Sequence, residues 1–158
     1  MRKRHISRAS GDGPQIVDSG VLDLANAVTV EITSEDETHP IECALEVRGA
    51  RGWRAAEPGP QIIRLLFDEP QHLKRIWLVF EETEFQRTQE FTLRWSPDHG
   101  QSFREIVRQQ WNFSPPGTIR ETEDYSVELS NVTIMELRIV PDQSGGDARA
   151  SLASLRLA

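Results

Sequence analysis

The most constraining feature of the sequence is a stretch of strictly alternating apolar and polar residues, Phe91-Thr92-Leu93-Arg94-Trp95-Ser96. Successive side chains of a strand point to opposite faces, so this alternation predicts a strand with one buried and one solvated face. Pro97-Asp98-His99-Gly100 follows at once. These residue types favour a tight turn, because proline fixes φ and glycine accepts a positive φ. We therefore expect a β-hairpin whose second strand lies within residues 101–110.

Other segments also have strand patterns. Further strands are expected at residues 61–67, 73–80, 127–129, 137–140 and, with a bend, 152–157. Loops rich in Pro and Gly separate them at residues 57–60, 68–70, 114–117 and 144–146. Short strands divided by such loops predict an all-β antiparallel sandwich or barrel with less than about a fifth helix. The in-phase apolar positions predict a core that contains Phe67, Ile76, Leu78, Leu93 and Trp95.

Length and charge define the domain organisation. A chain of 158 residues favours one domain. Residues 1–14 carry Arg2, Lys3, Arg4 and Arg8 against Asp12, a net charge of +3, which leaves −10 on the rest of a chain whose total is −7. We expect a basic flexible tail over residues 1–14 and a single domain over residues 15–158. A basic arm for nucleic acid or another partner is the alternative for the tail.

Composition excludes several classes of protein. The acidic balance argues against broad binding of a phosphate backbone, so nucleic acid is not an expected partner. No apolar run is long enough for a membrane helix, so no membrane association is expected. The single cysteine, Cys43, excludes an internal disulfide framework. No apolar segment of the secretory type follows the basic start, so we expect a cytoplasmic protein.

Several blocks of residues, taken in order, resemble a known family. They are Thr33–His39 with Gly52–Ala56, Gln61–Phe67 with Ile76–Phe80, Phe91–Phe103 with Trp111, and Ala150–Leu157. This order of a loop ending in Trp, a strand, a Pro turn, a central strand and a Ser-x-Asp-x-Gly hairpin is similar to the discoidin-type (coagulation factor 5/8 type C) domain. The resemblance implies an antiparallel jelly-roll β-sandwich of the galactose-binding-like kind. It also implies that loops at one end bind a ligand, most often carbohydrate.

A narrower likeness covers residues 33–80. The Ser-x-Asp-x-Thr-His lead and the Trp-Arg-Ala-Ala-x-x-Gly stretch resemble the N-terminal domains of X-ray repair cross-complementing scaffold proteins. This resemblance implies an intracellular module for protein–protein interaction, which is the alternative to a carbohydrate-binding module. The paired cysteines of many extracellular discoidin-type domains are absent, which also indicates an intracellular relative.

Signals for catalysis and for metal binding are scarce. The sequence has no His-Glu-x-x-His, no Gly-x-Ser-x-Gly and no phosphate-binding Gly loop, so we expect no enzyme. The four histidines lie too far apart in sequence to form a local two-His site. We therefore expect no cofactor. A structural calcium stays open, because oxygen ligands cluster at Glu35-Asp36-Glu37, whereas the Asp-Gly pair of the family is replaced by Leu45-Glu46-Val47-Arg48-Gly49.

The candidate ligand-binding residues are polar groups and aromatics that follow the predicted strands. Arg54, Glu82, Arg87 and Asn112 would hydrogen-bond hydroxyl groups, and Trp111 and Phe113 would stack on a sugar ring. In an extended segment residues 111 and 113 point the same way, so they would form an apolar ledge stiffened by Pro115-Pro116. A core position for these two aromatics is the equal alternative. Trp53 is expected to plug the sandwich rather than to bind.

Overall fold

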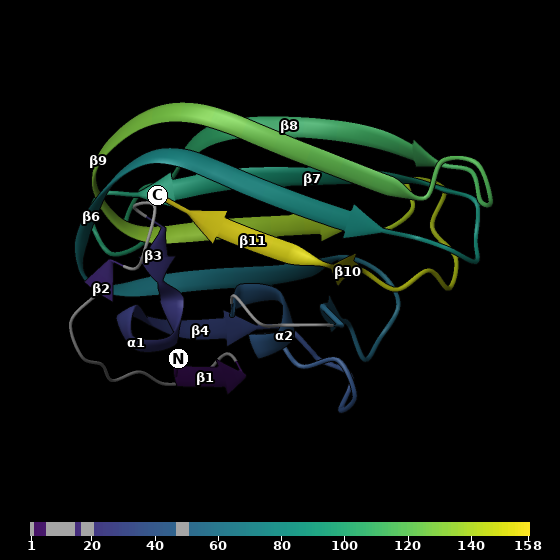
Figure 1. Cartoon of the computed structure of the whole chain (residues 1–158), viewed down its shortest axis with the longest axis horizontal. Helices are drawn as coiled ribbons and strands as arrows, with labels where there is room; N and C mark the ends of the chain where they lie inside the picture. The colour runs from purple at the N-terminus through teal and green to yellow at the C-terminus, as the bar shows by residue number, and fades with distance from the viewer. Residues whose placement is uncertain (1, 6–14, 17–20, 47–50) are drawn as a thin grey trace.

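Two very long strands organise the fold. The computed structural model describes residues 2–5, 15–16, 21–46 and 51–158. In it, β6 (Gln61–Glu81) and β9 (Arg120–Val140) pair antiparallel along most of their length. Both strands bend near the middle and so contribute to two facing layers, as Figure 1 shows. Strands make up 63% of the structure and helices 5%, which confirms the predicted all-β sandwich.

Each layer uses one half of each long strand. The first layer has the order β1 (Arg2–His5), β4 (Val28–Ile32), the first half of β6, the second half of β9, β7 (Arg87–Ser96) and β8 (Arg104–Phe113). In the second layer, β11 (Ser154–Leu157) pairs with the second half of β6, which pairs with the first half of β9. The short elements are β2 (Gln15–Ile16), β3 (Leu22–Asp23), α1 (Leu24–Ala27), α2 (Glu42–Leu45), β5 (Trp53–Arg54) and β10 (Ser151–Leu152).

The bend of β6 replaces a predicted turn. We expected separate strands at residues 61–67 and 73–80 with a proline turn between them, but the ladder with β9 resumes beyond Pro70 after register shifts. The alternation of buried and exposed positions shifts by one residue between Leu73 and Ile76. The apolar side chains of both halves of β6 therefore point toward the core. A bulged strand keeps its pairing partner while it changes layer, and a separate turn is therefore unnecessary.

A matching bend occurs in β9. The strands expected at residues 127–129 and 137–140 are both parts of β9, and Asn131 at the bend has a φ of 62°. Asparagine tolerates this left-handed conformation better than most residues. Its side-chain Nδ2 donates a hydrogen bond to the carbonyl of Pro97 at 3.2 Å, which ties the bend to the β7–β8 turn.

The β7–β8 hairpin forms as predicted, although its turn is more elaborate than the sequence pattern indicates. The Ser96 hydroxyl accepts hydrogen bonds from the backbone N–H groups of Asp98 (3.2 Å) and Gly100 (2.8 Å). Asp98 in turn accepts bonds from Ser102, and these with the Ser96 hydroxyl hold the pKa of the Asp98 carboxyl down at about 2. Side-chain hydrogen bonds therefore fix the conformation of this turn, together with the glycine.

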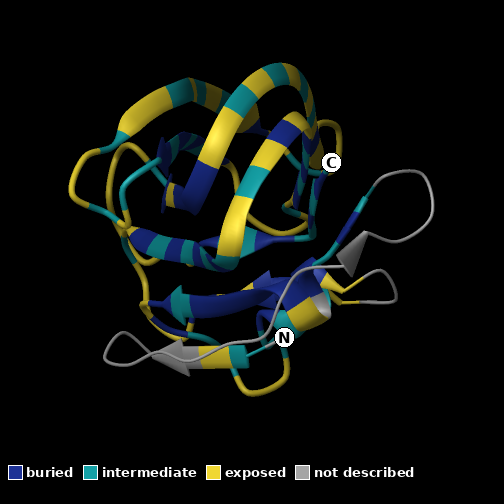
Figure 2. Ribbon diagram, turned by 90° about the vertical axis from the view of Figure 1, so that its left-hand side faces the viewer, coloured by how far each residue is buried: buried dark blue, intermediate teal, exposed yellow. Residues whose placement is uncertain are grey.

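The core lies between the two layers. The five residues predicted to be buried are all buried: Phe67, Ile76, Leu78, Leu93 and Trp95. Exposed residues follow the loops and the outward bends of the strands in Figure 2. Trp53 is also buried, and its Nε1 donates to the carbonyl of Ser34 at 3.1 Å, as expected for a residue that closes the sandwich.

The chain starts in the sheet. Arg2–His5, part of the expected tail, form β1 and pair in parallel with β4 at the edge of the first layer. Residues 6–14 of that tail lie outside the described residues. In Figure 1, β1 begins and β11 ends on the left, whereas the loops that follow β6, β8 and β9 lie on the right.

None of the helices in the described residues is long and apolar enough to span a membrane.

Candidate functional site

Four loop segments gather at one end of the sandwich, here called the loop end: residues 51–60, 82–86, 114–119 and 141–150 (Figure 1). They meet because β6 and β8 end where β7 begins. Arg54, Glu82 and Arg87 all line hollows here. The structure therefore brings together three of the predicted residues that are far apart in sequence.

The first hollow, of about 200 Å³, lies between the β5 segment and the end of β6. Its charged lining residues are three arginines, Arg51, Arg54 and Arg149, and three glutamates, Glu81, Glu82 and Glu84. The buried Trp53 lies among the lining residues.

The position of β5 depends on a glycine. Gly52 has a φ of +70°, and a Cβ at this position would lie 2.7 Å from the carbonyl oxygen of Leu152. Only glycine lets β5 approach β10 this closely. The backbone of Arg54 is then fixed by its N–H, which donates to His39 (3.1 Å), and by its carbonyl, which accepts from Asp36 (2.8 Å). The Arg54 side chain thus projects from a rigid support.

A second hollow, of about 400 Å³, adjoins the first, because Arg54, Glu82 and Arg149 line both. Phe85 and Asp142 lie on its wall. Phe85 is 58% exposed, the most exposed large apolar side chain in the described residues. Together the hollows offer guanidinium donors, a carboxylate acceptor and an aromatic face on one surface.

Arg87 is bonded within the protein. It is 3% exposed, and its guanidinium donates to Glu82 Oε1 (2.7 Å), to Gln89 Oε1 (3.1 Å) and to the carbonyl of Pro141 (2.8 Å). Through its Nε and Nη1 bonds the buried Arg87 fixes the position of Glu82, and its role as a ligand contact stays a prediction. Partial burial opposes ionisation of Glu82, but the bonds from Arg87 and the backbone N–H of Glu84 hold the pKa of its carboxyl below its ordinary value.

Of the two equal alternatives for Trp111 and Phe113, an apolar ledge and a core position, the structure supports the core position. Trp111 and Phe113 do point to the same side of β8, as expected for an extended segment, but that side faces the core. Phe113 is fully buried, and the guanidinium of Arg87 lies 4.8 Å from its ring centroid. Phe113 therefore has no face left for stacking on a sugar. Trp111 is half-buried and also borders a shallow hollow beside Asn112.

Asn112 lies on the opposite side of β8, in the solvent-exposed position expected for the residue between two inward-pointing aromatics. Its Oδ1 accepts a hydrogen bond from the Thr88 hydroxyl at 2.7 Å, and it borders two shallow hollows. Its role as a ligand contact stays a prediction.

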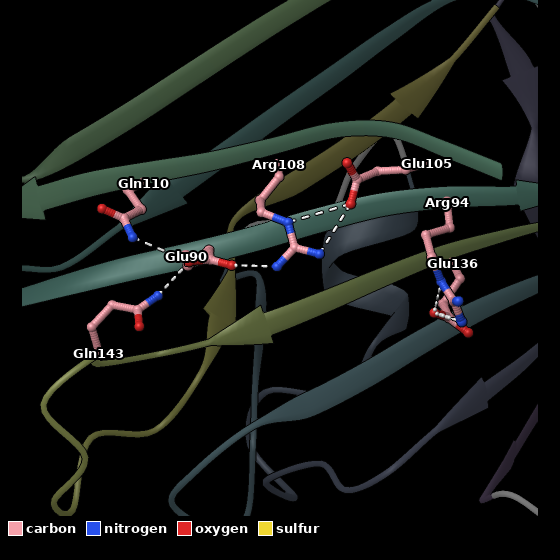
Figure 3. A network of polar contacts seen from close by, with 7 residues as sticks. All are labelled: Glu90, Arg94, Glu105, Arg108, Gln110, Glu136 and Gln143. Carbon is pink, nitrogen blue, oxygen red and sulfur yellow. Dashed lines mark hydrogen bonds and ion pairs between the residues drawn. The ribbon is translucent and has the colours of Figure 1, made fainter. Parts of the chain in front are cut away.

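The loop between β9 and β10 supplies lining residues that the sequence analysis missed, among them Asp142 and Arg149. Gln143 anchors this loop, since its N–H donates to the carbonyl of Thr88 (2.8 Å) and its Nε2 donates to Glu90 (2.6 Å). Figure 3 shows Glu90 also contacting Arg108 and Gln110 of β8. The β9–β10 loop, which lines the second hollow, is thereby hydrogen-bonded to β7 on the outer face of the first layer.

Two of the three carboxylates at Glu35-Asp36-Glu37 are engaged within the protein. Asp36 accepts bonds from the N–H (2.8 Å) and hydroxyl (2.7 Å) of Thr38, and Glu35 pairs with Lys3 (2.9 Å). The described residues contain no cluster of three or more His, Cys, Asp or Glu side chains that could hold a metal ion. Of the Leu45–Gly49 stretch, residues 47–49 lie outside the described part of the chain.

One cluster has the composition of a hydrolytic triad but not its setting. His72 contacts Glu128 (2.5 Å) and Ser130 (3.2 Å) at the bends of β6 and β9. The side chains of His72 and Glu128 are 45% and 69% exposed. Catalysis by a serine needs a shielded site with oxyanion donors, and His72, Glu128 and Ser130 line none of the hollows described here.

Comparisons with known proteins extend this description. No protein-family model matches the sequence, and no curated protein matches it significantly. Solved structures do match. A pectin-binding carbohydrate-binding module superposes with a TM-score of 0.61 at 16% identity, over 84% of this chain and 90% of that one.

Two further solved structures give similar values. The family 32 module of AlyQ, in complex with 4,5-unsaturated mannuronic acid, has a TM-score of 0.62 at 14% identity and covers 84% of this chain and 95% of its own. The CpGH89CBM32-5 module of Clostridium perfringens, in complex with GalNAc-β-1,3-galactose, has a TM-score of 0.61 at 20% identity, over 87% of this chain and 98% of that one. This protein therefore has the galactose-binding-like β-sandwich fold of these carbohydrate-binding modules.

Proposed function

We propose that this protein is a non-catalytic carbohydrate-binding module whose ligand site is the pair of adjoining hollows at the loop end. The observation that carries the proposal is that Arg54, Glu82 and Phe85 meet there with Arg149 on one surface. Sugars are recognised by planar polar groups that bond their hydroxyls and by aromatic faces that cover their apolar ring faces. These hollows offer both.

The solved structures support the same reading. Modules of this fold have been seen with mannuronic acid and with GalNAc-β-1,3-galactose. A shared fold does not determine the ligand, so the proposal depends on the hollows themselves. A cytoplasmic location and the absence of catalytic activity, both expected from the sequence, are parts of this proposal.

A glycan array followed by calorimetry tests the proposal. The unmodified protein is expected to bind at least one glycan class, and Arg54→Ala should weaken that binding by about tenfold or more, because a charge-assisted hydrogen bond is lost. Arg138→Ala is the matched control, since Arg138 is an exposed arginine of β9 that lines none of the hollows described. Equal loss in both variants, or no binding to any glycan, would overturn the proposal.

A second candidate function is favoured by one observation. Phe85 and Ile119 are the large hydrophobic side chains exposed in the described residues, and both lie at the loop end. The N–H of Glu82 donates to the carbonyl of Ile119 at 2.8 Å, so the two loops are adjacent. A protein partner could cover such a patch. This would correspond to the interaction module that the likeness to repair scaffolds implies.

The two candidates respond differently to one pair of variants. Ile119 lines neither of the two main hollows. Loss of glycan binding in Phe85→Ala with normal binding in Ile119→Ala supports a carbohydrate site. If both variants bind glycans with unchanged affinity and both lose a defined protein complex, the interaction module is supported.

A further inference from the structure

The distribution of ion pairs is uneven around the first hollow. Arginines elsewhere in the described chain are mostly paired with carboxylates: Arg2, Arg64, Arg75, Arg87, Arg94, Arg108 and Arg120. In contrast, no acidic side chain of the described residues pairs with Arg51, Arg54 or Arg149, which all line this hollow. All three are exposed. Within the described part of the chain, no ion pair therefore neutralises these three guanidinium groups.

Two of the three glutamates of the same hollow are paired with arginines that lie outside it. Glu81 pairs with Arg120, and Glu82 pairs with Arg87 at 2.7 Å. Neither Arg87 nor Arg120 lines the first hollow. Of the three carboxylates at its rim, Glu84 alone has no ion pair within the described chain. Three guanidinium groups thus face the hollow against one uncompensated carboxylate.

The backbones that carry the two central arginines are fixed. Arg54 belongs to β5 and pairs with Ser151 of β10, while Arg149 forms a bridge with Gly59. The N–H of Ala55 donates to the carbonyl of Ala150 at 2.9 Å, which joins the two segments directly beside both arginines. Because Arg54 and Arg149 project from neighbouring, anchored segments, one small anion can contact both. Guanidinium groups bind such anions through paired N–H donors.

We propose that this hollow binds the anionic group, a carboxylate or a sulfate, of an acidic sugar residue between Arg54 and Arg149, with Arg51 as a third contact. The inference rests on the proposed function and names the ligand class of that same site. Glu82, which lines both hollows, then accepts hydroxyl donors of the same ring. Phe85 lies beside it in the second hollow. A neutral sugar would leave the three guanidinium groups without the partner that their arrangement favours.

Calorimetry with matched ligands tests the proposal. The full chain is titrated with oligomers of galacturonate, glucuronate and mannuronate, and each acid is compared with its neutral hexose counterpart. Galactose 6-sulfate and its unsulfated form distinguish sulfate from carboxylate. At least one acidic ligand is expected to bind about 10- to 100-fold tighter than its neutral counterpart. The preference should shrink as salt is raised, because exposed charges are screened.

The variants Arg54→Gln and Arg149→Gln should weaken the acidic ligand by about tenfold or more beyond any weakening of its neutral counterpart, so that the preference for the acid is lost. Arg138→Gln, the control outside the hollow, should change neither affinity. Circular dichroism melting curves establish that all three variants are folded, which is expected because the three side chains are exposed.

The possible results separate the two proposals. Neutral sugars that bind as tightly as every acidic counterpart overturn the acidic ligand and leave the carbohydrate-binding function standing. Equal weakening of acidic and neutral ligands in the two hollow variants also overturns it. Absence of binding to every acidic and neutral ligand overturns both proposals.

Discussion

At the scale of single residues, Glu121 is a buried carboxyl group of the described chain that has no ion pair. It is fully buried near the start of β9. Its Oε1 accepts a hydrogen bond from Gln89 Nε2 at 3.2 Å, and its Oε2 has no hydrogen-bond partner among the residues that the structure describes. Burial, followed by the neighbouring Glu123 carboxylate, raises the pKa of Glu121 to about 8, although Gln89 and Arg87 oppose the shift. The folded protein therefore favours the protonated form, since a buried charge without full pairing is costly.

Glu121 should make folding stability depend on pH. A raised pKa means that its contribution is complete below its ordinary pKa of 4.5 and is lost as pH rises through about 8. At about 1.4 kcal/mol per pH unit, the free energy of unfolding should fall by about 2–4 kcal/mol between pH 5 and pH 9. Glu121→Gln should flatten this slope. Urea unfolding at several pH values measures the effect, and an unchanged slope in the variant would contradict the assignment.

Phe113 belongs to the core, so its removal should mainly affect folding. Phe113→Ala is expected to cost about 3–5 kcal/mol, because the ring is fully buried beneath Arg87. Asn112→Ala, one position away on the exposed side, should change the free energy of unfolding by less than about 1 kcal/mol. Chemical denaturation measures the free energy of unfolding of both variants and of the unmodified protein. A nearly neutral Phe113→Ala would contradict the core position and favour the contact surface, the other alternative from the sequence.

These residues show what sequence could and could not predict. Leu93 and Trp95 were predicted correctly because strict alternation identifies the inner face of a strand. The common direction of Trp111 and Phe113 was predicted too, but not which side it faced, because that depends on which face of β8 packs against the core, and the residues of this segment alone do not show it. Arg149 was missed, since its loop is brought to the hollow by long-range contacts with the β5 segment, among them the bridge to Gly59 and the bond from Ala55 to Ala150.

At the scale of elements, local pattern predicted strands but not their continuity. Pro70 was a sound reason to expect a turn, because proline cannot donate to a ladder. The structure keeps one strand through this point, since register shifts against β9 accommodate the missing donor. Whether a strand continues through a proline depends on its pairing with the neighbouring strand, so it cannot be predicted from the sequence of that strand alone.

The close approach of β5 to β10 should make Gly52 sensitive to substitution. Gly52→Ala is expected to cost about 1–3 kcal/mol, because the added Cβ requires a strained positive φ and would lie 2.7 Å from the Leu152 carbonyl oxygen. Glycan affinity should fall as well, since β5 carries Arg54.

Gly59→Ala is the matched control. It also has a positive φ, +89°, but nothing lies within 4 Å of its added Cβ. Thermal unfolding should therefore show a smaller loss for Gly59→Ala. Equal losses would mean that backbone strain alone, and not the contact with β10, determines the cost at Gly52.

At the scale of the whole molecule, the pairing scheme predicts slow folding. Gln61 pairs with Ile139, and Ile76 pairs with Leu157, so both layers close only when distant parts of the chain meet. Sandwiches dominated by such non-local pairing fold in milliseconds to seconds. Stopped-flow refolding, followed by tryptophan fluorescence, should show a main phase in this range. Complete recovery within microseconds would be inconsistent with this topology.

The placement of the two chain ends has a practical meaning for any assay of this protein. β1 begins and β11 ends on the side of the sandwich opposite the loop end (Figure 1). An affinity tag, a sensor chip or a fused reporter joined at either terminus would therefore be attached behind the hollows. An immobilised protein would therefore expose Arg54, Phe85 and Arg149 to the solution, because the support would be attached on the opposite side of the sandwich.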